Sequence, residues 1–287
     1  MSTSGSDQSP AAMTSAAAES PGRAGRNLPV AAGVGVLLAV LVLLSLYTYK
    51  WLFVVVVVGA IGIAVYELAT AVRSADVAVP LLPMVAASAV MLVAAYLDGA
   101  DTLAVAYVLT LVVVVMARLV VGHQRLVRDT VVAVFVVTYV ALLASFAMLM
   151  LAEPDGPDRI VVFILAVVAS DTGGYAVGVL TGRHPMAPKV SPKKSWEGLG
   201  GSFLFAAVAS AVAFAVLLDA SWWRGAVFGC VVVVTATLGD LGESLIKRDL
   251  GLKDMSHLLP EHGGLMDRLD SLLPTAPVAA VLLLALV

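Results

Sequence analysis

The polar residues of this chain concentrate in one segment near its end, between Gly239 and Leu272. Seven acidic and four basic side chains stand there, in a sequence that is 61% hydrophobic overall. Mg²⁺ takes oxygen ligands and shares them with substrate phosphates, while lysine and arginine neutralise the remaining phosphate charge. The segment therefore suits a divalent metal ion and a polyphosphate, with a solvated charged loop between membrane helices as the simpler alternative. The eleven residues are Asp240, Glu243, Lys247, Arg248, Asp249, Lys253, Asp254, Glu261, Asp267, Arg268 and Asp270.

The spacing within this segment predicts two helices joined by a turn. Ser244, Lys247 and Arg248 stand at i, i+3 and i+4, so a helix would place them on one face. Asp267 and Asp270 are three residues apart and would share a face of the next helix. Between them, Pro260 and the run His262-Gly263-Gly264 predict a break at which the backbone can approach a ligand closely.

A second polar cluster covers residues 170–201. Asp171 lies inside an apolar segment, where an ionisable residue is costly and usually functional; a structural aspartate that caps a broken helix is the alternative. Gly173 and Gly174 permit either close helix packing or a local break. The residues that follow suit a triphosphate through two hydroxyls and two ammonium groups, and Ser195 is placed to cap the next helix. These four are Ser191, Lys193, Lys194 and Ser195.

Composition places the chain in a membrane. It has 287 residues, 13% of them charged, and a mean hydropathy of +1.01, which indicates an integral membrane protein. Its single cysteine, Cys230, lies in an apolar run and excludes a disulfide within one chain.

Apolar stretches of roughly 20 residues, the length that crosses a bilayer as a helix, recur along the chain. We therefore expect an all-α, polytopic membrane protein with about nine transmembrane helices, after a disordered tail at 1–27. About five helices form an N-terminal region at 28–159, and residues 160–287 form a catalytic region with polar loops at 182–200 and 240–271. The predicted spans are 28–47, 52–72, 77–97, 102–121, 130–152, 160–181, 201–218, 225–239 and 272–287.

The distribution of basic residues predicts the orientation of these spans. With a cytoplasmic N-terminus, the inner segments would be the tail and the loops near 73–76, 118–129, 182–200 and 240–271. They hold 2, 1, 3, 4 and 4 lysines or arginines, which is 14 of the 17 in the chain. This bias follows the positive-inside rule and places both polar loops on the cytoplasmic side of the cell membrane.

Taken together, these segments resemble the signature of the phosphatidate cytidylyltransferases (CDP-diacylglycerol synthases). That signature is matched at every specified position by Ser244, Lys247-Arg248, Lys253-Asp254, Ser256, Leu259-Pro260, His262-Gly263-Gly264 and Asp267-Arg268-Leu269-Asp270. The array Asp171-x-Gly-Gly-Tyr, Gly182-Arg183 and Ser191-Pro-Lys-Lys-Ser-x-Glu-Gly198 resembles the same family. The likeness covers roughly residues 170–271, and the first five spans agree only in general character.

The resemblance implies the reaction of CTP with phosphatidate to give CDP-diacylglycerol and diphosphate, in phospholipid biosynthesis. It implies a dinuclear Mg²⁺ centre with Asp240 and Asp267 as the first ligands, joined by Asp270. A monovalent cation as the second ion is left open. The partners implied are CTP, phosphatidate in the bilayer and a second copy of the chain as a homodimer, with no nucleic acid.

The resemblance also implies roles for individual side chains. The catalytic group comprises Asp171, Asp240, Lys247, Arg248 and Asp267. Substrate contacts are expected from Ser191, Lys193, Lys194, Ser195, Ser244, Lys253, His262, Gly263, Gly264 and Arg268.

Two other functions compete with this interpretation. A CTP-dependent kinase of a polyprenol or phytol would also have several spans and acidic loops, but the full match at 244–270 argues against it. A transporter would carry charges on several helices near the membrane midplane and internal repeats. This chain shows no repeat, and its charges gather on one side.

Overall fold

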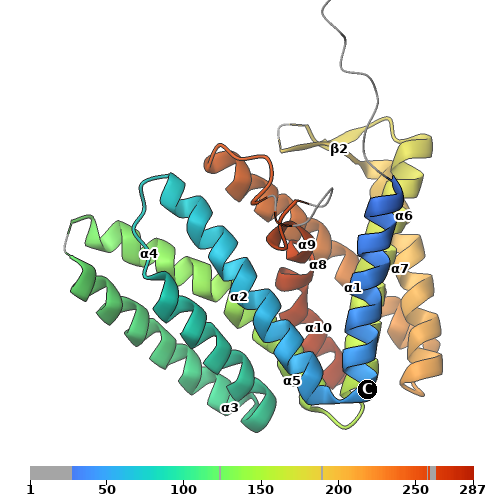
Figure 1. The fold of residues 1–287 in the computed structure, drawn as a ribbon. Coiled ribbons are helices and arrows are strands. Elements are labelled where there is room, and N and C mark those ends of the chain that lie inside the picture. The colour runs from blue at the N-terminus through green and yellow to red at the C-terminus, as the bar shows by residue number, and fades with distance from the viewer. Residues whose placement is uncertain (1–27, 123, 189, 257, 259–262) are drawn as a thin grey trace, which may run out of the picture.

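The computed structural model describes residues 28–122, 124–188, 190–256, 258 and 263–287 (Figure 1). The predicted disordered tail at 1–27 and His262 lie outside these residues. Apart from one short hairpin, the regular secondary structure of the described chain is helical, as expected for a membrane protein whose backbone groups must be satisfied within each segment. The valine-rich runs at 54–58, 112–115 and 231–234 all lie within helices.

The N-terminal region consists of helices that pack side by side. They are α1 (Leu28–Thr48), α2 (Lys50–Ser74), α3 (Leu81–Val121), α4 (Leu126–Val136), the π-helical turn η1 (Val137–Leu142) and α5 (Leu143–Ala152). A buried apolar core joins this region to the C-terminal helices and includes Leu68, Met84, Met148, Met266 and Leu283.

The C-terminal region holds the segments that were predicted to carry the chemistry. Its elements are α6 (Gly156–Thr181), β1 (Pro185–Ala187), β2 (Ser191–Ser195), α7 (Trp196–Leu217), α8 (Trp222–Asp249), α9 (Met266–Leu269) and α10 (Leu272–Leu286). The antiparallel hairpin β1–β2 was not predicted, because residues 182–200 were interpreted as a loop.

Seven helical segments of the described chain are long and apolar enough to cross a membrane. The protein is therefore an all-α, polytopic membrane protein, but the predicted count of nine spans is not confirmed. Two predicted spans fall within α3, whose 41 residues are interrupted at Gly99, where the backbone is not helical (φ 80°). The two ends of α3 meet again at Asp129, which binds Ala78 before the helix and Arg118 in its last turn, so α3 doubles back on itself.

The polar loops share one end of the molecule. Figure 1 places the end of α2, the hairpin and α9 at the top, and the C-terminus at the bottom. The bottom end joins the α1–α2 turn to the loop before α6, where Lys50 Nζ donates to Glu153 O at 2.5 Å. The segments at 73–76, 118–129, 182–200 and 240–271 thus lie at one end, while the side of the membrane that this end faces stays a prediction.

Close packing of α6 against α7 positions the hairpin above them. Gly173 and Gly174 on α6 face Gly201 and Ser202 on α7, and Ser202 Oγ donates to Ser170 O at 2.7 Å. Small residues let membrane helices approach closely. Of the two roles left open for Gly173 and Gly174, the structure shows close packing, because α6 continues unbroken through both.

Two adjacent glycines of α7 test this packing. A methyl group on Gly201 would lie 2.5 Å from Val177 Cγ2 and 2.6 Å from Gly173 O, whereas one on Gly200 has no neighbour within 4 Å. We expect Gly201→Ala to lower the free energy of unfolding by about 1–3 kcal/mol through overpacking. Gly200→Ala, the matched control, should be neutral or slightly stabilising because alanine favours helix. Thermal unfolding in detergent micelles measures both, and equal stability of the two variants would contradict the packing argument.

Candidate functional site

The C-terminal end of α8 supplies the first group of predicted site residues. Asp240, Ser244, Lys247 and Arg248 lie on successive turns of this helix, and the last three line one cavity, as their spacing predicted. Ser244 Oγ lies 3.5 Å from Asp240 Oδ1. The helix continues to Asp249, so its last two turns carry the charges beyond the apolar part of the bundle.

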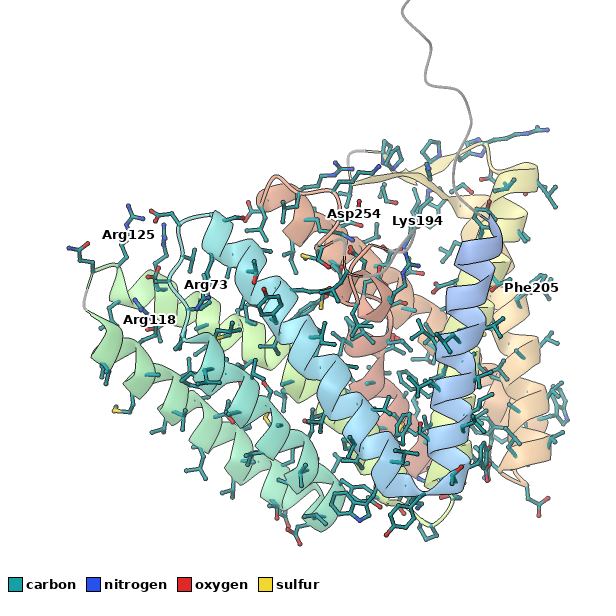
Figure 2. The ribbon with its side chains drawn as sticks, in the orientation of Figure 1. Arg73, Arg118, Arg125, Lys194, Phe205 and Asp254 are labelled. Atoms are coloured by element: carbon teal, nitrogen blue, oxygen red, sulfur yellow. The ribbon has the colours of Figure 1, made fainter. Side chains whose placement is uncertain are left out.

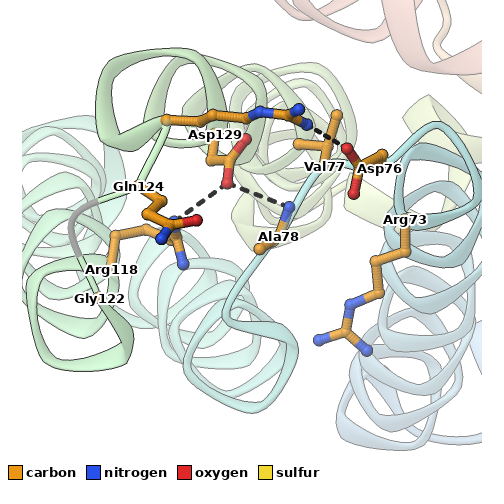
Figure 3. A pocket seen from close by; sticks show the side chains of 9 residues that line it. Arg73, Asp76, Val77, Ala78, Arg118, Gly122, Gln124 and Asp129 are labelled. Carbon is orange, nitrogen blue, oxygen red and sulfur yellow. Dashed lines mark hydrogen bonds and ion pairs between the residues drawn. The ribbon is translucent and has the colours of Figure 1, made fainter.

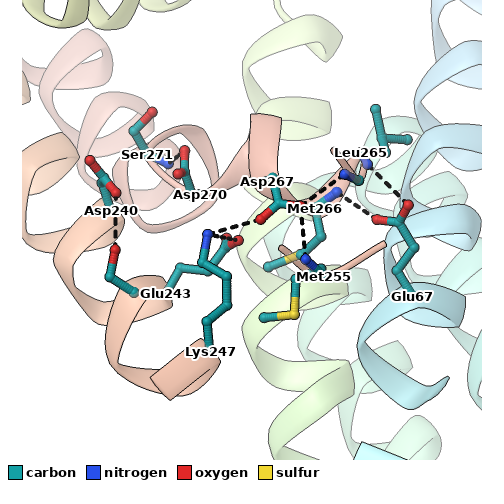
Figure 4. A network of polar contacts seen from close by, with 12 residues as sticks. Glu67, Asp240, Glu243, Lys247, Met255, Leu265, Met266, Asp267, Asp270 and Ser271 are labelled. Atoms are coloured by element: carbon teal, nitrogen blue, oxygen red, sulfur yellow. Dashed lines mark hydrogen bonds and ion pairs between the residues drawn. The ribbon is translucent and has the colours of Figure 1, made fainter. Parts of the chain in front are cut away.

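Lys247 connects α8 to the segment that contains α9. Its Nζ donates to Asp267 Oδ1 at 2.9 Å and lies 3.3 Å from Glu243 Oε1 (Figure 4). Glu243 is fully buried, and the Asp267 side chain is 7% exposed. A buried carboxylate needs a paired charge, so Lys247 stabilises both of these groups.

Asp267 also organises the turn that precedes it. Its Oδ2 accepts hydrogen bonds from Met255 N at 2.9 Å and Gly264 N at 2.8 Å. Gly263 has a φ of +76°, and a Cβ on Gly264 would lie 2.8 Å from a carboxylate oxygen of Glu67. The predicted glycine break is thus present, and the backbone there comes close to two carboxylates.

Glu67, on α2, holds the same segment from the other side, and sequence reasoning missed it. Its carboxylate accepts from Leu265 N at 3.0 Å, Met266 N at 2.8 Å and Ser256 Oγ at 2.5 Å, and Glu67 is 1% exposed. Figure 4 shows Glu67 reaching across from α2 to the start of α9. The signal was present, because Glu67 is an ionisable residue inside a predicted span, as Asp171 is.

The hairpin brings the second group of predicted residues to α8. Lys194, on β2, forms an ion pair with Asp240. Ser195 is the N-cap of α7, as predicted, and its Oγ accepts from Gly198 N at 3.1 Å. Glu197 fixes the hairpin, because its Oε1 lies 2.6 Å from His184 Nδ1 and its Oε2 accepts from Arg183 N at 3.2 Å.

Two cavities adjoin at this place. The first, of about 280 Å³, lies between α6, α7 and α8 and is lined by the acidic Asp171 and Asp240 together with Lys193, Lys194 and Ser195. Among the described residues, the second cavity, of about 240 Å³, is lined by four cationic side chains and by no carboxylate. Lys193 lines both. The polar side chains of the second cavity are Ser191, Lys193, Ser244, Lys247, Arg248 and Lys253.

Three carboxylates converge beside the first cavity. Asp171, Asp240 and Asp270 repel one another electrostatically, and Ser271 links two of them through Ser271 Oγ to Asp171 Oδ2 (3.5 Å) and Ser271 N to Asp270 Oδ1 (2.7 Å). A divalent cation would relieve this repulsion, and carboxylate oxygens are the ligands that Mg²⁺ prefers.

The arrangement of the described residues is not that of a closed metal site. Within the ranges given above, no group of three or more Asp, Glu, His or Cys side chains is close enough to hold a metal ion. Lys194 and Lys247 lie where a cation would lie, against Asp240 and Asp267 respectively. The ligand roles of Asp240, Asp267 and Asp270 therefore stay predictions.

The remaining predicted residues fall into two sets. Arg268, on α9, is exposed and lines neither cavity, and Gly263 and Gly264 contribute through the turn rather than through a cavity wall. Two further groups enter the acidic region without having been predicted as site residues. Glu243 could have been found from its i, i+4 spacing to Lys247. The second group is the buried Tyr139 hydroxyl in η1, which lies near Asp240, Glu243 and Asp270.

Glu67→Gln tests whether α2 holds the segment that precedes α9. An amide has one oxygen to accept from three donors, and its NH₂ group would face backbone N–H groups. Loss of a hydrogen bond to a charged group is worth about 1.5–3 kcal/mol, so the amides of Leu265 and Met266 should exchange about 10- to 100-fold faster. Hydrogen-exchange mass spectrometry measures this, with Asp98→Asn, an exposed carboxylate on α3, as the control. Unchanged exchange at residues 265 and 266 would mean that Glu67 does not hold them.

Comparisons with known proteins identify the family of this chain. The chain matches the cytidylyltransferase family over residues 30–286. It is 39% identical to the phosphatidate cytidylyltransferase of Mycobacterium leprae, over 91% of this chain and 89% of that protein. It is 36% identical to the protein of the same name from Mycobacterium bovis, over 97% and 93%. A phosphatidate cytidylyltransferase of Haemophilus influenzae is 42% identical over 40% of this chain and 42% of its own. The chain is therefore a member of the cytidylyltransferase family and a membrane-embedded nucleotidyltransferase.

Proposed function

We propose that this protein transfers the cytidylyl group of CTP to phosphatidate, giving CDP-diacylglycerol and diphosphate. The observation that carries the proposal is the pair of adjoining cavities between apolar helices: the described lining of one has four cations, and that of the other has two carboxylates and two lysines. The relatives are named phosphatidate cytidylyltransferases, and that name indicates phosphatidate as the acceptor and a cytidine nucleotide as the donor.

The cationic cavity suits the triphosphate of CTP. Four cations face one space: Lys193 comes from the hairpin, Lys247 and Arg248 from the end of α8, and Lys253 from the segment that follows α8. A nucleoside triphosphate brings about four negative charges, which such a cluster neutralises through charge-assisted hydrogen bonds. Arg248 and Lys253 are exposed, so their positive charges can attract the nucleotide from the aqueous phase.

The first cavity suits the phosphate of phosphatidate. It opens beside α6, whose Tyr175 is 75% exposed on the outer face of the bundle, so the acyl chains can stay among lipids. In the reaction, a phosphate oxygen of phosphatidate forms a bond to the α-phosphorus of CTP. The bond from that phosphorus to the bridging oxygen breaks, and diphosphate leaves with the electron pair.

The chain's own part in this reaction is charge neutralisation and positioning. A phosphate monoester is already anionic, so the attacking group needs little help from a base. Lys193 lines both cavities and is placed to contact both substrates, while Lys194 and Lys247 hold Asp240 and Asp267 in place.

Mg²⁺, if held by Asp240 and Asp270 with Asp171 or Asp267, would supply further charge neutralisation on the phosphates. Carboxylate oxygens are the ligands that Mg²⁺ prefers, but binding would require these side chains to move closer together and Lys194 and Lys247 to leave Asp240 and Asp267. We further propose that the site faces the cytoplasm, where CTP is found, in agreement with the distribution of lysine and arginine.

The assay that tests the proposed function uses purified full-length protein in detergent with phosphatidic acid and radiolabelled CTP. We expect equal amounts of CDP-diacylglycerol and diphosphate with Mg²⁺ and none with EDTA. Asp240→Asn should lower the rate by about 100-fold or more, the effect of removing one electrostatic contact in an active site. Asp219→Asn, at the opposite end of the bundle, is the control. Formation of CDP with a phosphorylated isoprenoid alcohol would instead identify a kinase.

Arg248→Gln tests the assignment of the cationic cavity. This exposed side chain lines that cavity, so the variant should raise the KM for CTP about tenfold through loss of one phosphate contact. The KM for phosphatidate and the unfolding temperature should not change. Arg183→Gln, an exposed cation outside both cavities, is the matched control. An equal effect of the two substitutions would indicate a diffuse charge effect and not a phosphate site.

A further inference from the structure

A third polar cavity lies in the N-terminal region, at the same end of the molecule as the candidate site. It measures about 910 Å³ and lies between the end of α2, the two ends of α3 and the start of α4 (Figure 3). Figure 2 shows Arg73, Arg118 and Arg125 at one side of the bundle, away from Lys194 and Asp254. No residue of the candidate site lines it.

The lining of this cavity carries more positive than negative charge. Arg73, Arg118 and Arg125 face it together with Asp76 and Asp129, which leaves a net charge of +1 (three minus two). Both carboxylates are already engaged, since Arg125 pairs with Asp76 and Arg118 Nη2 lies 3.1 Å from Asp129 Oδ2.

Arg73 is the cation left without a carboxylate. Its Nη2 donates to a neutral acceptor, Val79 O, at 2.7 Å, and no acidic side chain in the described ranges forms an ion pair with it. Figure 3 shows its guanidinium on the opposite side of the cavity from Asp129 and directed away from Asp76. The guanidinium fork matches the oxygens of a phosphate and binds them at two points.

Arg118 has an unsatisfied donor. The residue is 2% exposed, and its Nε has no hydrogen-bond partner in the part of the chain that the structure describes. A buried donor without a partner is unfavourable, and Arg118 lines the cavity while this donor stays unpaired. Burial of Arg118 by the bundle makes this a preformed group, unlike a surface arginine.

Two exposed apolar side chains stand close in sequence to residues that line the cavity. Val120, near the end of α3, is 87% exposed, and Val127, in the first turn of α4, is 77% exposed. Such side chains at the ends of membrane-spanning helices contact lipid. Basic pockets between membrane helices, at the level of the lipid headgroups, bind anionic headgroups.

We propose that Arg73, Arg118 and Arg125 bind the phosphate of an anionic phospholipid headgroup in this cavity. The ligand is a phosphate anion, and the neighbouring apolar side chains favour a lipid over soluble phosphate as its source. The site is separate from the cavities that hold the reacting groups, so the proposal does not rest on the proposed reaction.

The test measures binding, so that it is independent of turnover. Full-length protein in detergent micelles is titrated with phosphatidylglycerol or with phosphatidylcholine of the same acyl chains, and bound lipid is counted by native mass spectrometry. We expect phosphatidylglycerol to bind in preference. Arg73→Gln and Arg118→Gln should each weaken its binding about tenfold. Arg73 forms no ion pair with the described acidic residues, so Arg73→Gln remains informative if Arg118→Gln fails to fold.

The matched control is Arg128→Gln. Arg128 is an exposed cation in the same cluster, beside Asp129 at 3.3 Å, but it does not line the cavity. Its loss should change binding by less than about twofold. Displacement of phosphatidylglycerol by inorganic phosphate, dependent on Arg73, would keep the phosphate site but make its source soluble. Equal binding of the two lipids, or an equal effect of Arg128→Gln and Arg73→Gln, would overturn the proposal.

Discussion

Charged groups that lie inside a membrane protein have to be paired, and in this protein Lys247 is the cation that pairs with two carboxylates between α8 and α9. It lies against the fully buried Glu243 and the nearly buried Asp267. Removing one partner of a buried pair leaves an uncompensated charge, at a cost of about 3–5 kcal/mol. The end of α8 is therefore tied to the start of α9, although residues 250–256, which follow α8, form neither helix nor strand.

The start of α9 is held by carboxylates on two sides. Asp267 accepts from the amides of Met255 and Gly264, and Glu67 accepts from those of Leu265 and Met266. Hydrogen bonds to charged acceptors are stronger than neutral ones. Because Glu67 belongs to α2, the position of the candidate site depends on the N-terminal helices, which the family model also matches.

The distribution of charge divides this end of the molecule into regions with different chemistry. Carboxylates converge between α6, α8 and α10, cations without carboxylates gather at the hairpin and the end of α8, and arginines surround a third space beside α3. The close contact of α6 with α7 through Gly173 and Gly201 places the hairpin above the first two regions. From the hairpin, Lys194 pairs with Asp240 on α8, and Lys193 shares a cavity with Ser244 and Lys247 of the same helix.

Local patterns in the sequence determined the features whose physical cause is local. The long apolar segments predicted membrane helices, the i, i+3, i+4 spacing placed Ser244, Lys247 and Arg248 on one face, and Ser195 was predicted as a helix cap. The motifs that resembled the family also led to the correct family. Each of these depends on residues within one or two helical turns, or on a run of apolar side chains.

Tertiary structure alone decided the rest. Glu67 meets Leu265 and Met266 across 198 and 199 residues of sequence, and no periodicity reports such a contact. The doubling back of α3 depends on Asp129 binding both of its ends. Whether Asp240 and Asp267 meet a lysine or a metal ion depends on where two separate loops fold. These contacts join segments that only the packed helices bring together, so the spacing of residues along the chain cannot predict them.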